Sequence, residues 1–341
     1  MIKILNAESM RKKVADSVNK YLSISNNQSL TVGFYKSGKM YAFSNFDSPL
    51  SLSYDIGSIT KTITAHLILN LAEDGKIELG ESVSRYIDLP NGNYPTVYEL
   101  LTHTAGYGHL TPREITVPAL LKHGYAKKNI YENCTAETVI NCLKRRRKKR
   151  NSGYSYSDFT YAILAVVAES VTGKRFSSLI LDFVQNELNM KDTVISLSED
   201  ERNPRSAYGK RVINFWKWEN ENPYIAGGGL VSNVTDMLTY IAHEIESDKS
   251  YITKAHKICE NSLSQKRNLA SCIGWHTYRN SNQLWHVGGV GTFRSSIIIN
   301  KKRKIGVVVF GNSKGIASAN VHYLAKMLYS EMKMKKINFE N

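Results

Sequence analysis

The chain has 341 residues, a hydrophobic fraction of 42% and a formal net charge of +15 at pH 7. This length can bury a large core, arranged as one big domain or two. No apolar window reaches about 18 residues, and the N-terminus lacks the apolar run of a secretory signal. We therefore expect no transmembrane segment and a cytoplasmic protein, with peripheral association with a surface as an alternative.

Cysteine and charge usage exclude other classes. The four cysteines lie far apart without a C-x-x-C pair, which favours buried free thiols over a zinc or redox site. Positive charge is concentrated in the run KRRRKKR, which begins at Lys144 and ends at Arg150. Such a run is typically solvated, and a polyanion is the partner that it would contact. No nucleic-acid-binding motif accompanies it, so we expect no nucleic acid partner.

The N-terminal part of the chain predicts a helix, a hairpin and a second helix. Apolar residues recur at helical spacing over residues 8–22. Residues 30–34 and 40–43 alternate around Ser37-Gly38, as in a β-hairpin. A long helix then opens at Ser58 and stops at Asp74-Gly75, because glycine favours the end of a helix.

The remaining elements are helical first and extended later. Residues 97–200 are predicted to be mostly helical, with loops at 103–112, 122–134 and 144–155 and an apolar helix at 159–172 that ends at Gly173. Strands return from about residue 205. Two antiparallel hairpins and a final helix are expected there, at 272–278 with 283–286, 295–299 with 305–310, and 317–332.

This order predicts an α/β (α+β) fold in a single domain, residues 1–341. An antiparallel sheet, built from both ends of the chain and flanked by the N- and C-terminal helices, would form one lobe from about 1–95 and 205–341. Residues 96–204 would form a mostly helical lobe, with the Ser58 helix packed between the two. A groove between the lobes is where a site is expected.

Ser58 and Lys61 form a Ser-x-x-Lys motif where that central helix begins. A serine hydroxyl needs a nearby base to act as a nucleophile, and a lysine one helical turn along can supply it. The tetrapeptide is weak by itself, because it also occurs at Ser9, Ser17 and Ser330. In those three copies, the surroundings predict amphipathic surface helices.

Two distant segments offer complementary chemistry. Tyr156 precedes the helix at 159–172, and a tyrosine beside a cation can shuttle a proton. His286 is followed by Gly288-Gly289 at the end of a predicted strand, where glycines let a backbone N–H approach a substrate. With the N–H of Ser58, this N–H would form an oxyanion hole.

Five segments together resemble the serine β-lactamase-like family, which includes class C β-lactamases, penicillin-binding DD-peptidases and related esterases. They occur in the family order, from the nucleophile region to the late His-x-Gly block. The segments are YDIGSITKTITAHLILNLAEDGKIELGESVSRYI, LLTHTAGYG, GYSYSDFTYAILAVVAESVTG, AGGGLVSNVTDM and WHVGGVGTF.

The resemblance implies a role for each matched residue. Ser58 would be the acylated nucleophile, and Lys61 and Tyr156 would share general acid and base work. The N–H groups of Ser58 and Gly289 would form the oxyanion hole, and His286 would line the cleft. No metal or organic cofactor is expected.

Asp158 departs from the family pattern. It stands where class C β-lactamases have asparagine, and an ionised aspartate accepts hydrogen bonds but cannot donate one to a substrate carbonyl. Its charge beside Lys61 also favours the ammonium form. We therefore expect acyl transfer without efficient β-lactam hydrolysis.

The expected function is that of a serine hydrolase acting through an acyl-enzyme on an amide or ester. A D-amino-acid-containing peptide is the first expected substrate, as in DD-peptidases and carboxypeptidases. A small ester and a β-lactam follow. The alternatives from a different class are a penicillin-binding sensor and a protein that uses its basic run for interaction.

Overall fold

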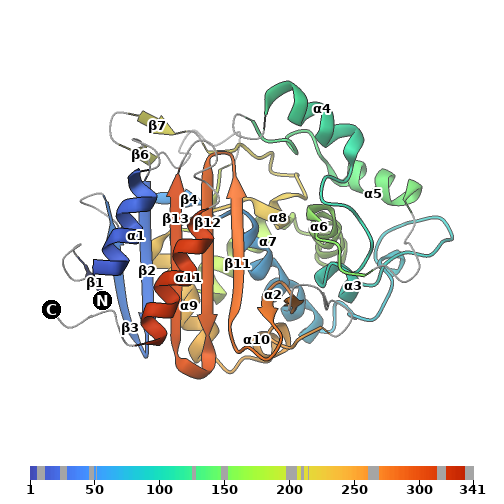
Figure 1. Cartoon of the computed structure of the whole chain (residues 1–341). Helices are drawn as coiled ribbons and strands as arrows, with labels where there is room; N and C mark the ends of the chain where they lie inside the picture. The colour runs from blue at the N-terminus through green and yellow to red at the C-terminus, as the bar shows by residue number, and fades with distance from the viewer. Residues whose placement is uncertain are drawn as a thin grey trace.

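The computed structural model describes residues 1–5, 12–23, 29–45, 50, 52–124, 128–146, 153–196, 206–208, 211–213, 215–259, 269–312 and 320–334. Its centre is an eight-stranded sheet in the order β1-β3-β2-β13-β12-β11-β10-β9 (Figure 1). Neighbouring strands are antiparallel except for the parallel pair β1 and β3. These strands are β1 (Ile2–Ile4), β2 (Ser29–Lys36), β3 (Lys39–Ser44), β9 (Leu269–Ser271), β10 (His276–Tyr278), β11 (Leu284–Val290), β12 (Phe293–Asn300) and β13 (Ile305–Asn312).

Helices cover both faces of this sheet. The terminal helices α1 (Lys12–Ser23) and α11 (Asn320–Lys333) contact each other, and α11 packs on β12 and β13 (Figure 1). Helix α9 (Val234–Glu246) contacts the same strands and β2. Successive strand residues face opposite sides, so Val307 of β13 joins the cluster under α11 while Val308 joins the main core. The expected α/β fold, with a mostly antiparallel sheet covered by the N- and C-terminal helices, is confirmed, and these two helices share one face of the sheet.

A largely helical region lies beside the sheet (Figure 1). Short strands form a three-stranded sheet of order β4-β8-β5 and a two-stranded sheet of β6 and β7, neither of which the sequence pattern predicts. The helices and strands of these parts are η4 (Val83–Arg85), α3 (Val97–Leu101), α4 (Arg113–His123), α5 (Ala136–Arg145), α6 (Asp158–Thr172), α7 (Phe176–Asp182), η5 (Phe183–Glu187), α8 (Ile225–Gly228), α10 (Ser250–Ala255), β4 (Ser53–Asp55), β5 (Val194–Ile195), β6 (Ser206–Tyr208), β7 (Arg211–Ile213) and β8 (Leu230–Asn233).

Helix α2 (Thr60–Glu73) runs through the interior and is buried on nearly all sides. It follows the 3-10 turn η3 (Gly57–Ile59) and contacts α6, α8 and α10. The helix ends at Asp74 and Gly75, where Gly75 has a φ of +72°, as the Asp-Gly pair predicts. Because these helices pack around α2, they fix the position of its first turn.

Three local expectations are wrong. Residues 272–278 do not form one strand, since Gly274 has a φ of +76° and β10 begins only at His276. Ser58 lies in the 3-10 turn before α2 rather than in the α-helix itself. Gly288 and Gly289 lie inside β11, which continues to Val290 and then turns at Gly291, with a φ of +56°.

Candidate active site

Ser58 and Lys61 face the same side of the turn that leads into α2. Residues three apart are neighbours on a helix surface, and Lys61 Nζ lies 3.1 Å from Ser58 Oγ. The Lys61 side chain is fully buried, whereas Ser58 borders an open pocket. The motif therefore places a hydroxyl in the pocket and an amine directly behind it.

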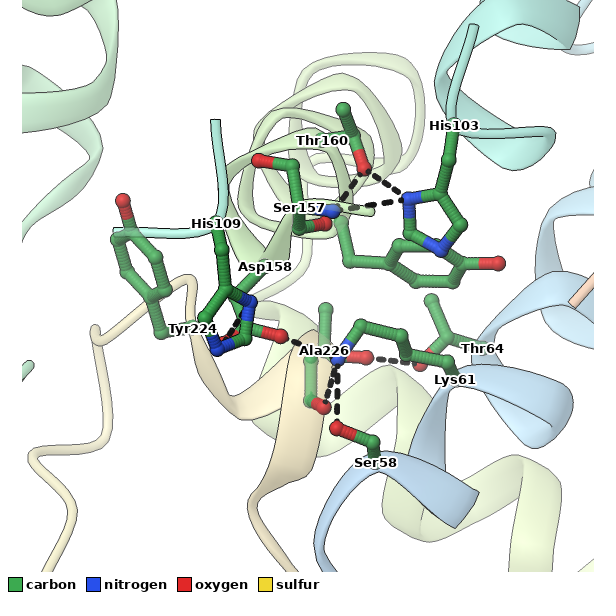
Figure 2. A network of polar contacts seen from close by, with 12 residues as sticks. Ser58, Lys61, Thr64, His103, His109, Ser157, Asp158, Thr160, Tyr224 and Ala226 are labelled. Atoms are coloured by element: carbon green, nitrogen blue, oxygen red, sulfur yellow. Dashed lines mark hydrogen bonds and ion pairs between the residues drawn. The ribbon is translucent and has the colours of Figure 1, made fainter. Parts of the chain in front are cut away.

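Two further acceptors surround the Lys61 amine. Its Nζ lies 2.5 Å from Asp158 Oδ1 and 2.6 Å from the carbonyl oxygen of Gly227, and Figure 2 shows Lys61 directed between Ser58 and Asp158. Three acceptors suit the three N–H donors of an ammonium ion. Burial lowers the pKa of Lys61, and the charge of Asp158 opposes that shift. Lys61 therefore gives up a proton more readily than an exposed lysine does.

Asp158 is the first residue of α6 and has different partners on its two oxygens. The Tyr131 hydroxyl donates to Oδ2 at 2.7 Å, and His109 Nδ1 lies 4.0 Å from the same oxygen. Burial raises the pKa of Asp158. The charges of Lys61 and His109 and the hydrogen bonds from Lys61 and Tyr131 lower it by more, so the pKa lies below its ordinary value. The carboxylate is therefore ionised at neutral pH.

Tyr156 packs over the amine, and a histidine packs against Tyr156. The Tyr156 ring centroid lies 5.1 Å from Lys61 Nζ. Burial and the charge of Asp158 raise the pKa of Tyr156, and a hydrogen bond with Ser58 lowers it less. His103 Nδ1 lies 3.3 Å from the N–H of Ser157, which donates to it (Figure 2), and the two rings of His103 and Tyr156 are 4.6 Å apart. This histidine joins the loop after α3 to the loop before α6.

Strand β11 lies unusually close to the segment before Ser58. A Cβ atom added to Gly288 would stand 2.0 Å from the carbonyl oxygen of Ile56 and 2.3 Å from Ser295 Oγ. Real Cβ atoms do not approach that closely, so only glycine allows this contact. His286, two residues earlier on β11, is buried, and burial lowers its pKa. It contributes a neutral ring to the pocket wall.

The pocket has a volume of about 700 Å³. It gathers residues from η3, α6, β11 and the segments beside them, and Lys61 lies behind its wall. Six of the seven residues expected from the sequence line it, namely Ser58, Tyr156, Asp158, His286, Gly288 and Gly289.

Three other lining residues, His276, Arg294 and His322, carry no sequence signal. The rings of His276 and of His322 of α11 each lie 4.7 Å from Trp285 between centroids, tilted by 39° and 34°. Trp285 itself begins the last of the five family-like segments. The other three come from separate elements, and no motif links them.

The basic run lies only partly within the described residues. Lys144 and Arg145 end α5, and the next residue is Arg146. Arg145 and Arg146 form ion pairs with Glu114 at 3.2 and 2.7 Å. Residues 147–150 lie outside the described residues, so polyanion contact through this run stays a prediction.

Neither a metal cluster nor a membrane span is present in the described part of the chain. Among the residues that the structure describes, no cluster of three or more His, Cys, Asp or Glu side chains is placed to hold a metal ion. None of the helices in this part of the chain has both the length and the apolar character that spanning a membrane requires.

A comparison with known protein families shows to which family the chain belongs. A profile described as Beta-lactamase matches residues 26–329. The chain belongs to the Beta-lactamase family. This family match spans every residue of the site described above.

Relatives in the Beta-lactamase family are distant in sequence. The "Protein flp" of Staphylococcus aureus (strain MW2) is 23% identical over 312 residues, which are 85% of this chain and 58% of that protein. The "D-alanyl-D-alanine-carboxypeptidase/endopeptidase AmpH" of Escherichia coli (strain K12) is 26% identical over 203 residues, which are 57% of this chain and 49% of that protein. The chain thus spans less than two thirds of the length of these curated relatives.

Solved structures share the fold of this Beta-lactamase family chain. The octameric penicillin-binding protein homologue from Pyrococcus abyssi has a TM-score of 0.73 at 22% identity, covering 96% of this chain and 78% of its own. The Beta-lactamase/D-alanine Carboxypeptidase from Yersinia pestis also has a TM-score of 0.73, at 18% identity, covering 94% and 98%. At these identities the likeness establishes the fold.

Proposed function

We propose that the chain is a serine hydrolase that forms an acyl-enzyme on Ser58. One observation carries this proposal, namely the contact of Ser58 Oγ with the buried Lys61 amine at 3.1 Å, at the border of a pocket. A nucleophile with a base behind it is the arrangement that acyl transfer needs. Membership of the Beta-lactamase family supports the same reaction class.

The proposed chemistry proceeds in two steps. Ser58 Oγ attacks the substrate carbonyl while its proton passes to the neutral form of Lys61, which the lowered pKa of this amine makes easier to reach. Tyr156 stays protonated because its pKa is raised, so it relays that proton to the departing amine or alcohol. Water then attacks the acyl-enzyme and gives a proton to the same pair, which returns a proton to Ser58 Oγ as the bond to the acyl group breaks and the acid leaves.

Charge that develops on the carbonyl oxygen needs hydrogen-bond donors. The N–H groups of Ser58 and Gly289 are our candidates for this oxyanion hole, as the family resemblance implies. Gly57 brings these two segments together, since its absent Cβ would stand 2.6 Å from the nitrogen of Gly289. His286 and Gly288 would line the substrate path beside them.

A D-amino-acid-containing peptide is the substrate class that we favour. One similar protein, from Escherichia coli, is named a D-alanyl-D-alanine-carboxypeptidase/endopeptidase, and another, from Yersinia pestis, a Beta-lactamase/D-alanine Carboxypeptidase. Asp158 accepts hydrogen bonds from Lys61 and Tyr131 and, as a carboxylate, cannot donate to the acylamido carbonyl of a β-lactam. A small ester is the second candidate and a β-lactam the third.

Covalent labelling tests the nucleophile. The purified protein is treated with a fluorophosphonate or a fluorescent penicillin, and the labelled residue is found by mass spectrometry. We expect labelling on Ser58 and its loss in Ser58→Ala, while a control Ser330→Ala, on the surface copy of the motif, labels normally. Labelling that persists in Ser58→Ala would refute the assignment.

Turnover separates a hydrolase from a penicillin-binding sensor. The protein is incubated with nitrophenyl esters, D-amino-acid amides, DD-dipeptides and a chromogenic cephalosporin. We expect multiple turnovers on at least one ester or peptide. A stable mass shift without any product would favour the sensor.

A further inference from the structure

Tyr131 lies behind Asp158, in a segment where the sequence shows no motif. Its hydroxyl donates to Asp158 Oδ2 at 2.7 Å, while the other carboxylate oxygen lies 2.5 Å from Lys61 Nζ. The two oxygens of one carboxylate therefore connect Tyr131 with the amine behind Ser58. Tyr131 does not border the pocket, so it acts on a substrate only through Asp158.

A rigid frame holds the Tyr131 ring in place. The ring stacks on Tyr224 with centroids 4.2 Å apart and planes 10° from parallel. The N–H of Tyr131 donates to Asn129 Oδ1 at 2.9 Å, and its carbonyl oxygen accepts from Asn222 Nδ2 at 2.7 Å. The side chain is buried, so the direction of its hydroxyl is fixed before any substrate binds.

We propose that Tyr131 is a positioning residue of the acyl-transfer site. Its hydroxyl holds the carboxylate of Asp158 so that the other carboxylate oxygen stays in contact with the amine of Lys61. The proposal rests on the function proposed above and deepens it. A hydroxyl that donates to Oδ2 fixes the rotation of the carboxylate. It also draws negative charge away from Oδ1, which weakens the attraction that keeps Lys61 protonated.

Other titratable groups also face this ion pair. Burial and Asp158 act on Lys61 most strongly, and the remaining groups stay in place when the Tyr131 hydroxyl is removed. They are His103 and His109 from the loop after α3, Tyr156 just before α6, Tyr161 of α6, Tyr224 before α8, His276 of β10 and His286 of β11. A changed pH dependence of labelling in Tyr131→Phe therefore reports the loss of the Tyr131 hydroxyl alone.

The test is the pH dependence of fluorophosphonate labelling at Ser58. Labelling should rise with pH as Lys61 loses its proton. We call the part of the profile where labelling still rises with pH the acidic limb. In Tyr131→Phe, we expect the acidic limb to move up by about one pH unit, and labelling at a pH below it to fall about tenfold. A hydrogen bond to a charged group contributes about 1.5–3 kcal/mol, and we expect part of that energy to appear as a raised pKa of Lys61. The rate at the alkaline plateau should stay the same.

Tyr224→Phe is the matched control. It removes a hydroxyl from the ring stacked on Tyr131, and that hydroxyl donates to the carbonyl oxygen of Thr111 at 2.6 Å rather than to Asp158. The acidic limb of this variant should match that of the unchanged protein. The proposal would be overturned if the acidic limbs of Tyr131→Phe and Tyr224→Phe lay at the same pH.

A double-mutant cycle distinguishes positioning from a general structural role. When Asp158→Asn is present, Tyr131 has no charged acceptor, so adding Tyr131→Phe should leave the limb where it is. The same upward shift in both backgrounds would also overturn the proposal. Labelling that persists in Ser58→Ala is a different outcome, because it refutes the proposed nucleophile rather than the role of Tyr131.

Discussion

Gly57 and Gly289 lie so close together that a Cβ atom on Gly57 would stand 2.6 Å from the backbone nitrogen of Gly289. Gly57 also has a φ of +52°, in the left-handed region that side chains rarely adopt. The turn that holds Ser58 and the C-terminal end of β11 therefore meet through bare backbone. This contact sets the spacing between the proposed nucleophile and one proposed oxyanion donor.

Gly57→Ala should separate these two segments. The new methyl group must push β11 away or distort the turn, so we expect the rate of Ser58 labelling to fall by about 10²-fold or more, in the range of losing one oxyanion donor. Gly80→Ala is the matched control, because nothing lies within 4 Å of the added Cβ there. Labelling of the Gly57 variant at the rate of the Gly80 variant would contradict this account of the oxyanion hole.

Lys61→Arg keeps the positive charge beside Asp158 but removes the base. A guanidinium stays protonated at all ordinary pH values, so labelling should fall by about 10²–10⁴-fold, the range of general base catalysis. Stopped assays with a fluorophosphonate measure this rate.

Lys61→Met provides the stability comparison. It removes the buried partner of the Asp158 carboxylate, which should lower the free energy of unfolding by about 3–5 kcal/mol. Urea unfolding measures this loss. Unimpaired labelling of the arginine variant would show that Lys61 is not the base.

Asp158→Asn should move the acidic limb in the direction opposite to Tyr131→Phe. The Asp158 charge raises the pKa of Lys61 against the effect of burial. Without that charge, Lys61 loses its proton at lower pH, so the limb moves down. The asparagine can also donate to a carbonyl, so labelling by a fluorescent penicillin should become faster. An unchanged limb together with unchanged penicillin labelling would contradict the role given to Asp158.

His276 should make the protein less stable in acid. Burial lowers its pKa to about 4, against about 6.5 in an unfolded chain. Between these values the unfolded state binds the proton and the folded state does not, so stability falls as pH drops from 6.5 to 4. The full effect is about 3 kcal/mol, at about 1.4 kcal/mol for each pH unit.

His276→Phe keeps a ring against Trp285 but removes the titration. Urea unfolding at pH 7 and pH 4 should show that this variant loses about 3 kcal/mol less between the two conditions than the unchanged protein. Because the comparison is made within each protein, any packing cost of the phenylalanine cancels. Equal losses in both proteins would show that His276 does not carry this dependence.

Local patterns predict much of the fold because they depend on neighbours in the chain. The apolar run at residues 305–310 predicts a strand, and the structure has β13 there, with residues buried on both faces. Gly173 predicts the end of the apolar helix, and its φ of +67° ends α6. The Ser58 motif likewise follows from helical spacing, and its contact with Lys61 spans only three residues.

What the amino-acid sequence by itself determined is the set of elements, the Ser58-Lys61 pair and the presence of a carboxylate at position 158. Only the tertiary structure decided which groups surround that pair. Gly227 and Tyr131 reach Lys61 and Asp158 across 166 and 27 residues of chain, and the absent Cβ of Gly288 matters only because Ile56 lies against it. Such contacts follow from the packing of distant elements, and no local periodicity encodes them.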